Sequence, residues 1–259
     1  MSFLDIVVLS VIQGVAEFLP ISSSGHLVLV GHWLGIEEAK GTLNIMLHAG
    51  TLLSILVFYF SHTLKLLKED RRVIPLLIVG TIPAALAGVI IKKKFEWLTG
   101  DPWIAGSMLI ITGIILVLSK YVRREKEVDY QETSWFAAFA IGCAQAFAIL
   151  PGISRSGSTI FAGQWMGLKR ESAGTFSFLL AMPIIGGATC YEMISLSSDE
   201  SSSDASIGLM LAGALISFAV GYLSLRLLVS FIQKGKFHLF AWWCIPFGII
   251  SLIILAVAG

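Results

Sequence analysis

Two stretches of this sequence place polar residues and chain-breaking Pro, Gly and Ser inside long apolar segments. The first is residues 13–26, QGVAEFLPISSSGH, and the second is residues 145–158, QAFAILPGISRSGS. Irregular backbone that faced lipid would leave N–H and C=O groups without hydrogen-bond partners. Each break is therefore expected to face protein or a water-filled cavity. Broken segments at corresponding places in two halves of a membrane protein indicate a site near the bilayer midplane.

The two stretches also resemble each other. A shift of 132 residues superposes identical residues, among them Gln13 on Gln145, Ser22 on Ser154, Ser24 on Ser156 and Gly25 on Gly157. Pro20 and Pro151 align only with a slip of one residue. The match predicts two pseudo-repeats, about 1–130 and 131–259, within one integral membrane domain that covers residues 1–259.

The composition places the chain in a membrane. Hydrophobic residues make up 56% and charged residues only 14%, and the mean hydropathy is +0.85. A soluble domain carries about 25% charged residues. The net charge of +1 and the lack of a basic cluster with interleaved aromatic residues give no indication of nucleic-acid binding. The three cysteines, Cys143, Cys190 and Cys244, are expected to be small buried hydrophobic residues without a disulfide.

The lengths of the apolar segments separate spans from shorter pairs. A helix needs about 20 residues to cross a bilayer. Six segments approach this length: 44–60, 73–91, 103–119, 173–196, 207–232 and 239–258. The segments on either side of each break are shorter and predict re-entrant helix pairs: 3–19 with 27–36, and 135–150 with 159–168. The predicted fold is all-α and polytopic, with six transmembrane spans and two oppositely oriented re-entrant pairs from an inverted repeat.

The distribution of Lys and Arg over the loops predicts the orientation. With the first pair re-entrant from outside and the second from inside, twelve Lys and Arg fall in cytoplasmic loops, including 61–72 and 120–132, and four fall outside. Cytoplasmic loops carry the excess of basic residues. Both termini and the acidic serine-rich loop 197–206 are then expected outside. Lys92, Lys93 and Lys94 are discordant, and could meet lipid headgroups or an anionic substrate instead.

Six ionisable residues are expected within the bilayer once the loops are set aside: Glu17, His26, His48, Arg155, Glu192 and Arg226. Such residues are costly in hydrocarbon and mark functional sites by default. Glu17, His26 and Arg155 flank or occupy the breaks, so a site is favoured over an ion pair that only neutralises buried charge. His48 fits helix packing as well as function. The last two lie near span ends, where snorkelling to the interface is favoured.

The residue types at the breaks suit phosphate chemistry. Hydroxyls and backbone N–H groups of the 22–25 run, SSSG, can bind phosphate oxygens, and the guanidinium of Arg155 can bind them in bidentate fashion. Glu17 could hold a divalent cation, because Mg²⁺ takes one or two carboxylates together with substrate phosphates. His26 could act as a nucleophile or as an acid or base. Phosphoryl transfer needs mainly positioning and charge neutralisation, which this set supplies.

These residues carry a family resemblance. The segments EFLPISSSGH at 17–26 and PGISRSGST at 151–159 resemble the two signature motifs of the bacterial undecaprenyl-diphosphate phosphatases, also called bacitracin-resistance proteins. The resemblance covers essentially the full chain in length, segment order and motif position. It implies hydrolysis of undecaprenyl diphosphate to undecaprenyl phosphate and inorganic phosphate, which recycles a lipid carrier of cell-wall synthesis. It also implies dependence on Mg²⁺ or Ca²⁺, and a location in the bacterial inner membrane with the active site facing the outer, periplasmic side.

The resemblance also assigns roles by motif position. Glu17 is the metal-associated acid, Arg155 binds the diphosphate, and Ser23 and His26 are both candidates for nucleophile and proton transfer. The remaining expected substrate contacts are Gln13, Ser22, Ser24, Gly25, Ser154, Ser156 and Gly157. Many family members have Glu-x-x-x-Glu in the first motif, whereas this chain has Gln13 and Glu17 on one helical face. The amide of Gln13 can coordinate a cation or bind phosphate, but it adds no negative charge.

Three other functions can be compared with these residues. A purely structural membrane protein would leave Glu17 and Arg155 at depth unexplained. The membrane phosphatidate-phosphatase-like superfamily places a His six residues after its second-motif Arg, and Phe161 stands there in this chain, so that class is excluded. A transporter or flippase of a prenyl phosphate lipid remains an alternative, because inverted repeats with broken helices are a transporter architecture and fold does not fix function. A homodimer and a monomer both remain open.

Overall fold

The computed structural model describes residues 3–35, 42–122, 127–198 and 207–258. The long and medium helices are α1 (Phe3–Ala16), α2 (Ser23–Leu34), α3 (Thr42–Phe58), α4 (Phe60–Lys68), α5 (Val73–Lys94), α7 (Pro102–Leu118), α8 (Trp135–Phe147), α9 (Arg155–Trp165), α10 (Arg170–Ser198), α11 (Ile207–Gln233) and α12 (Ala241–Ala258). Short helical turns are α6 (Trp97–Gly100), η1 (Ser119–Tyr121), η2 (Tyr130–Glu132) and η3 (Phe237–Phe240). No strand occurs in these ranges, where only Val128 and Leu168 form an isolated β-bridge.

The predicted all-α polytopic fold is confirmed. Five helices are long and apolar enough to cross a membrane, and α3 with α4 makes a sixth candidate that is bent by 68°. These six correspond to the six spans expected from the sequence. The prediction of a plain charged loop after α3 is wrong, because α4 occupies most of it. Leu66 of α4 is buried, while Lys65 and Lys68 lie in its last turn. The segment is therefore an amphipathic helix, which its basic residues made look like a loop in the sequence.

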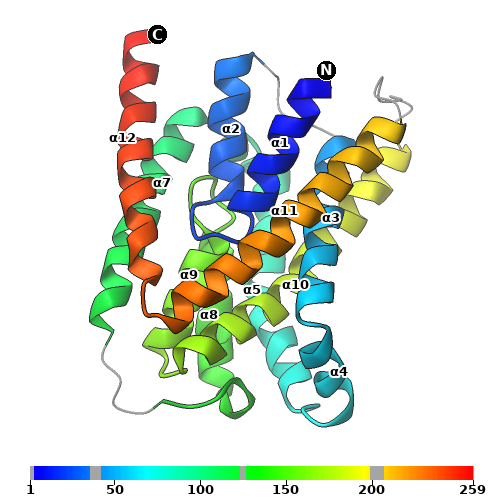
Figure 1. The fold of residues 1–259 in the computed structure, drawn as a ribbon, viewed down its shortest axis with the longest axis vertical. Helices are drawn as coiled ribbons and strands as arrows, with labels where there is room; N and C mark the ends of the chain where they lie inside the picture. Colours follow the sequence, from blue (N-terminus) through cyan, green and yellow to red (C-terminus); the bar gives the residue numbers. More distant parts are fainter. Residues whose placement is uncertain (1–2, 36–41, 123–126, 199–206, 259) are drawn as a thin grey trace.

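The four helices beside the breaks are too short to span. α1, α2, α8 and α9 have 14, 12, 13 and 11 residues. Figure 1 shows both breaks at mid-height in the molecule: α1 and α2 extend from one break towards the end that carries both termini, and α8 and α9 extend from the other towards the opposite end. This arrangement has the opposed directions that the sequence predicted, while re-entry into a bilayer stays a prediction.

Each broken pair packs against a long helix from the other half of the chain. α1 lies against α11 and α8 lies against α5, while α3 packs on α11 and α7 packs on α12. The contact of α8 with α5 is close because Gly142 faces the backbone of Gly80, and a Cβ on Gly142 would collide with the Gly80 carbonyl oxygen. Small residues permit such close approach between membrane helices. The broken pairs are thereby held inside the bundle.

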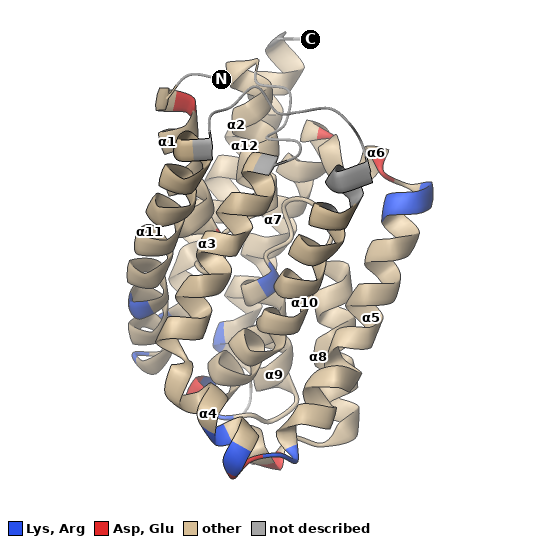
Figure 2. Ribbon diagram, turned by 90° about the vertical axis from the view of Figure 1, so that its right-hand side faces the viewer, with Lys and Arg blue, Asp and Glu red and all other residues tan. Residues whose placement is uncertain are grey.

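Charged residues gather at the two ends of the molecule, with few between them (Figure 2). Lys92, Lys93 and Lys94 close α5 at the end opposite to α4. At the α4 end, the hydroxyl of Tyr130 donates to Asp70 at 3.1 Å, and burial, together with Asp70, raises the pKa of Tyr130 to about 12. The loop 199–206, Lys40 and residues 123–126, which the orientation count used, lie outside the described residues.

Three expectations about side chains in apolar segments can be compared with the structure. Cys244 is buried, but Cys143 and Cys190 are exposed on the surface of the bundle, so the expectation that all three are buried is wrong. In a membrane protein the outer surface is itself apolar, and a cysteine is accommodated there as well as in the core. Arg226 is also on the surface, as a snorkelling residue would be. His48 contacts the carbonyl oxygen of Asn44 through Nδ1 at 2.9 Å, as expected for a histidine satisfied within its own helix.

Candidate functional site

The two breaks meet at the centre of the bundle. The amide N–H of Gly152 donates to Oγ of Ser22 at 3.1 Å, a hydrogen bond between residues 130 positions apart. A Cβ on Gly25 would lie 2.7 Å from Cα of Gly152, so a side chain at Gly25 would force the breaks apart. Gly152 also has φ 94°, a left-handed conformation that glycine adopts readily. The glycines of the two motifs are therefore required for their contact.

Each break ends in a serine that caps the following helix in the same way. Oγ of Ser22 accepts from the N–H of Gly25 at 3.3 Å at the start of α2, and Oγ of Ser154 accepts from the N–H of Gly157 at 3.0 Å at the start of α9. In each motif the capping serine also lies close to the serine two residues later, at 3.4 Å for Ser24 and 3.2 Å in the second motif. The serine and glycine pairs that the shift of 132 positions matched are thus equivalent in these cap contacts.

A buried threonine of α7 supports the second break. The hydroxyl of Thr112 donates to the carbonyl oxygen of Gly152 at 2.7 Å and accepts from the N–H of Ser154 at 3.0 Å. The carbonyl of Gly152 and the N–H of Ser154 thus have hydrogen-bond partners, which irregular backbone inside a membrane requires. The sequence analysis missed this residue. Its only signal was a hydroxyl within an otherwise apolar span.

Glu17 receives hydrogen bonds from three side chains. Its Oε2 accepts from Oγ of Ser23 at 2.8 Å and from Nε2 of Gln13 at 3.2 Å, and its Oε1 accepts from a guanidinium nitrogen of Arg155 at 3.1 Å. The side chains of the ion pair are 8% exposed for Glu17 and 13% for Arg155. The next residue, Phe18, is fully buried edge-on against Phe178. Ser23 and Arg155, both expected from the sequence, are therefore in direct contact with the carboxylate of Glu17.

His26 is held differently. Its Nδ1 lies 2.8 Å from the carbonyl oxygen of Ser22, and its Nε2 accepts from the indole N–H of Trp243 at 2.9 Å. An indole nitrogen can only donate, so Nε2 is the unprotonated nitrogen, Nδ1 carries the proton and the ring is neutral. The ring also stacks on Phe247 at 4.6 Å between centroids. Trp243 was not anticipated, because a tryptophan in an apolar span gives no signal of such a contact.

These contacts distinguish the two candidate nucleophiles. Both ring nitrogens of His26 are engaged, and the accepting lone pair points to Trp243. The hydroxyl of Ser23 instead donates to a carboxylate, the arrangement in which a base activates a hydroxyl nucleophile. The geometry thus favours Ser23 for attack and leaves His26 a positioning role, through its bond to the backbone of Ser22.

The other expected substrate contacts are arranged around this centre. Ser24 is exposed, whereas Ser156 is buried. The N–H groups of Gly25 and Gly157 are used by the helix caps, so these two amides are occupied in this conformation. Hydroxyls, the guanidinium and the amide of Gln13 are the remaining groups for a phosphate.

Several buried polar atoms of the motifs have no hydrogen-bond partner among the described residues. They are Oε1 of Gln13, Nη1 of Arg155, Oγ of Ser158 and both amide atoms of Gln145. Outside the motifs, only His62 and Thr189 share this condition in the described part of the chain. Unpaired buried polar atoms are costly and require an explanation. A polar ligand at the motifs would provide one. Gln145 therefore becomes a further candidate for ligand contact. The sequence indicated it only as the residue that the shift of 132 positions places on Gln13.

The residues present fit a cation that arrives with a phosphate ligand. Among the described residues, no group of three or more His, Cys, Asp or Glu side chains could hold a metal ion. Glu17 nevertheless offers a carboxylate beside the unpartnered Oε1 of Gln13. Mg²⁺ is commonly bound by one or two carboxylates plus substrate phosphates and waters. The oxygen donors that this chain supplies are of that kind.

Several helices of the bundle are long and apolar enough to cross a membrane, and an acid, an arginine and a serine are in contact where the two breaks meet. These features define a multi-pass membrane protein with a polar site inside the helical bundle. The chain belongs to the family of the bacitracin resistance protein BacA, whose model matches residues 6–250.

Relatives with close similarity carry the name undecaprenyl-diphosphatase. The protein from Rhodopirellula baltica is 49% identical over 249 residues, which cover 96% of each chain. The protein from Desulfatibacillum aliphaticivorans is 37% identical over 270 residues and 95% of each chain. The protein from Methanosphaera stadtmanae is 35% identical over 277 residues and 98% of each chain.

Proposed function

We propose that this protein hydrolyses undecaprenyl diphosphate to undecaprenyl phosphate and inorganic phosphate, and so recycles the lipid carrier of cell-wall synthesis and confers bacitracin resistance. The observation that carries the proposal is the hydrogen bond from Ser23 to Glu17 at 2.8 Å, beside the guanidinium of Arg155. A serine with an adjacent base and a cation within reach is the equipment for attack on a phosphorus atom. Family membership and the names of the relatives support the same reaction.

The first step is attack by Oγ of Ser23 on the terminal phosphorus. The bond from Oγ to phosphorus forms, and the proton of the hydroxyl passes to Oε2 of Glu17. The bond from the terminal phosphorus to the bridging oxygen breaks, and its electron pair leaves with undecaprenyl phosphate. Arg155 neutralises charge on the phosphate oxygens, for which its unpartnered Nη1 is available.

The second step is hydrolysis of the phosphoserine. Water attacks phosphorus, the bond to Oγ of Ser23 breaks, and Glu17 returns its proton to that oxygen. Both protons of the water stay on the inorganic phosphate that is released. His26 does not exchange a proton in either step, because its Nε2 accepts from Trp243 and its Nδ1 bonds to Ser22.

A divalent cation, Mg²⁺ or Ca²⁺, belongs to the proposal. Glu17 and Oε1 of Gln13 would hold it together with the phosphate oxygens of the substrate, and it would neutralise part of the diphosphate charge. The proposal also places the protein in the bacterial inner membrane with the site accessible from the periplasmic side, on the basis of the loop charges. All residues of the site come from one chain, so the reaction requires no second subunit.

Transport of a prenyl phosphate lipid is the second candidate, because the broken helices fit a transporter as well. Phosphate release by purified protein in detergent separates the two functions. We expect wild type to release phosphate from undecaprenyl diphosphate with Mg²⁺ or Ca²⁺, and Ser23→Ala and Glu17→Gln to release almost none. Absence of release from folded wild type with either metal would reject the hydrolase and favour the transporter. Full activity in Ser23→Ala would reject the nucleophile.

A further inference from the structure

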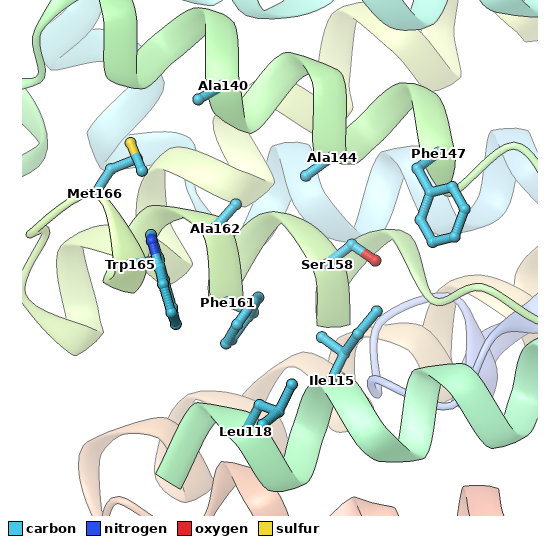
Figure 3. A pocket seen from close by; sticks show the side chains of 10 residues that line it. All are labelled: Ile115, Leu118, Ala140, Ala144, Phe147, Ser158, Phe161, Ala162, Trp165 and Met166. Carbon is cyan, nitrogen blue, oxygen red and sulfur yellow. The ribbon is translucent and has the colours of Figure 1, made fainter. Parts of the chain in front are cut away.

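An apolar groove lies between α7, α8 and α9, on the side of the second break. Its volume is about 420 Å³, within the range of pockets that bind small molecules. Figure 3 shows its lining, which is contributed by Ile115, Leu118, Ala140, Ala144, Phe147, Ser158, Phe161, Ala162, Trp165 and Met166. Ala144 of α8 and Ala162 of α9 contribute only small side chains to this lining (Figure 3).

One end of the groove adjoins the polar site. Ser158 lies one helical turn beyond Ser154 and Arg155 on α9, and its side chain points into the groove (Figure 3). Ser158 is only 4% exposed, and its hydroxyl has no partner among the described residues. Other buried helical serines, such as Ser10 and Ser54, return the hydroxyl to the carbonyl four residues earlier. Ser158 therefore offers a free hydroxyl where the groove meets the site.

The corresponding place in the first half of the chain is filled. The shift of 132 residues that superposes the motifs puts Ser158 at the position of His26. The ring of His26 stacks with Phe247 at 4.6 Å and with Trp243 at 6.1 Å between centroids. Aromatic rings thus pack against this position on α2, whereas the equivalent position on α9, Ser158, borders the groove.

We propose that this groove binds the prenyl chain of the lipid diphosphate whose head group occupies the Glu17–Arg155 site, an inference that rests on the proposed function. The groove runs from Ser158, beside the site, to Leu118 and Trp165, the last residues of α7 and α9, towards the end of the molecule that carries α4 (Figure 1). The chain of an outer-leaflet lipid points away from the outer surface. A head group held at the midplane from the outer side therefore directs its chain into the inner half, where the groove lies. The hydroxyl of Ser158 faces the polar start of that chain.

The test compares a long with a short substrate. Ala162→Phe fills the groove, and Ala85→Phe makes the same change at an exposed position of α5 as a matched control. We expect Ala162→Phe to lower kcat/KM for undecaprenyl diphosphate at least about tenfold, since loss of burial for two methylenes already gives that factor. Its kcat/KM for geranyl diphosphate should stay within about twofold of wild type, and Ala85→Phe should change neither substrate.

The outcomes are separable. An equal loss for both substrates, or no loss for undecaprenyl diphosphate, would overturn the groove as the chain site while leaving the hydrolase intact. No phosphate release by wild type from either substrate would instead reject the proposed function. If Ala162→Phe does not fold, Ala144→Leu makes a smaller obstruction with the same readout. A prenyl diphosphate with a photoreactive group along its chain should label the 158–166 segment, and labelling only elsewhere would contradict the proposal.

Discussion

Removal of Glu17 and removal of Arg155 should have unequal effects on stability, although the two form one ion pair. Glu17→Ala leaves the buried guanidinium without its acidic partner in the described part of the chain, and its Nη1 already has no partner. Breaking a buried pair in this way costs about 3–5 kcal/mol of the free energy of unfolding. Arg155→Ala leaves the carboxylate with two donors, Ser23 and Gln13. That variant should lose only about 1–3 kcal/mol, stay folded and lose turnover.

The double variant Glu17→Ala/Arg155→Ala should be more stable than the sum of the two losses predicts. Its removal of both charges avoids the unpaired guanidinium, so the coupling energy should be about 1–3 kcal/mol. Reversible unfolding in mixed micelles with increasing denaturing detergent, followed by circular dichroism, gives the four free energies of the cycle. Equal losses in the single variants, with additivity within about 0.5 kcal/mol, would refute the argument that this pair carries buried charge.

Three further predictions concern the surroundings of the pair. Trp243→Phe keeps an aromatic ring but removes the donor to His26, so it should cost about 1 kcal/mol of stability and lower turnover; unchanged turnover would show that the ring orientation is not used. Thr112→Val leaves two buried backbone groups unpaired and should cost about 2 kcal/mol or more in the same unfolding assay, whereas Thr112→Ser should retain stability. Gln13→Glu adds a second carboxylate beside Glu17, so the Mg²⁺ concentration for half-maximal turnover should fall several-fold, and an unchanged metal titration would place the cation elsewhere.

The arrangement of helices could be predicted because apolar length and chain breaks fix it locally. A segment such as 207–232 is too long and apolar for any other role. Pro20 and Pro151 mark the two chain breaks, which the structure places at residues 17–22 and 148–154; the expected first break, 20–25, extended too far, because residues 23–25 form the first turn of α2. The amphipathic helix α4 was missed because its basic residues outweighed its few apolar ones. Exposure of Cys143 could not be predicted either, since the lipid-facing and core-facing sides of a span are both apolar.

The members of the site were predicted, but their contacts were not. The motifs indicated Glu17, Ser23 and Arg155 as separate polar residues in unfavourable surroundings. Glu17 bonds to Arg155, which is 138 positions away. This contact exists because the two breaks meet, and their meeting depends on packing between helices from both halves. Trp243 gave no signal because a tryptophan in a span is unremarkable in sequence. The groove beside α9 is likewise lined by small side chains from two helices, Ala144 and Ala162, which only the fold brings together.

The two similar motifs contribute different side chains to the surroundings of one carboxylate. The shift of 132 residues puts Ser23 at the position of Arg155, and both side chains bond to Glu17. The position equivalent to Glu17 is Ile149, so the second copy of the motif cannot form a matching centre. In the proposed mechanism the two similar halves therefore share a single reaction centre, to which one half would give the nucleophile and the base and the other the cationic group. A non-hydrolysable diphosphate should accordingly saturate at one molecule per chain, despite the two-fold pattern of the sequence.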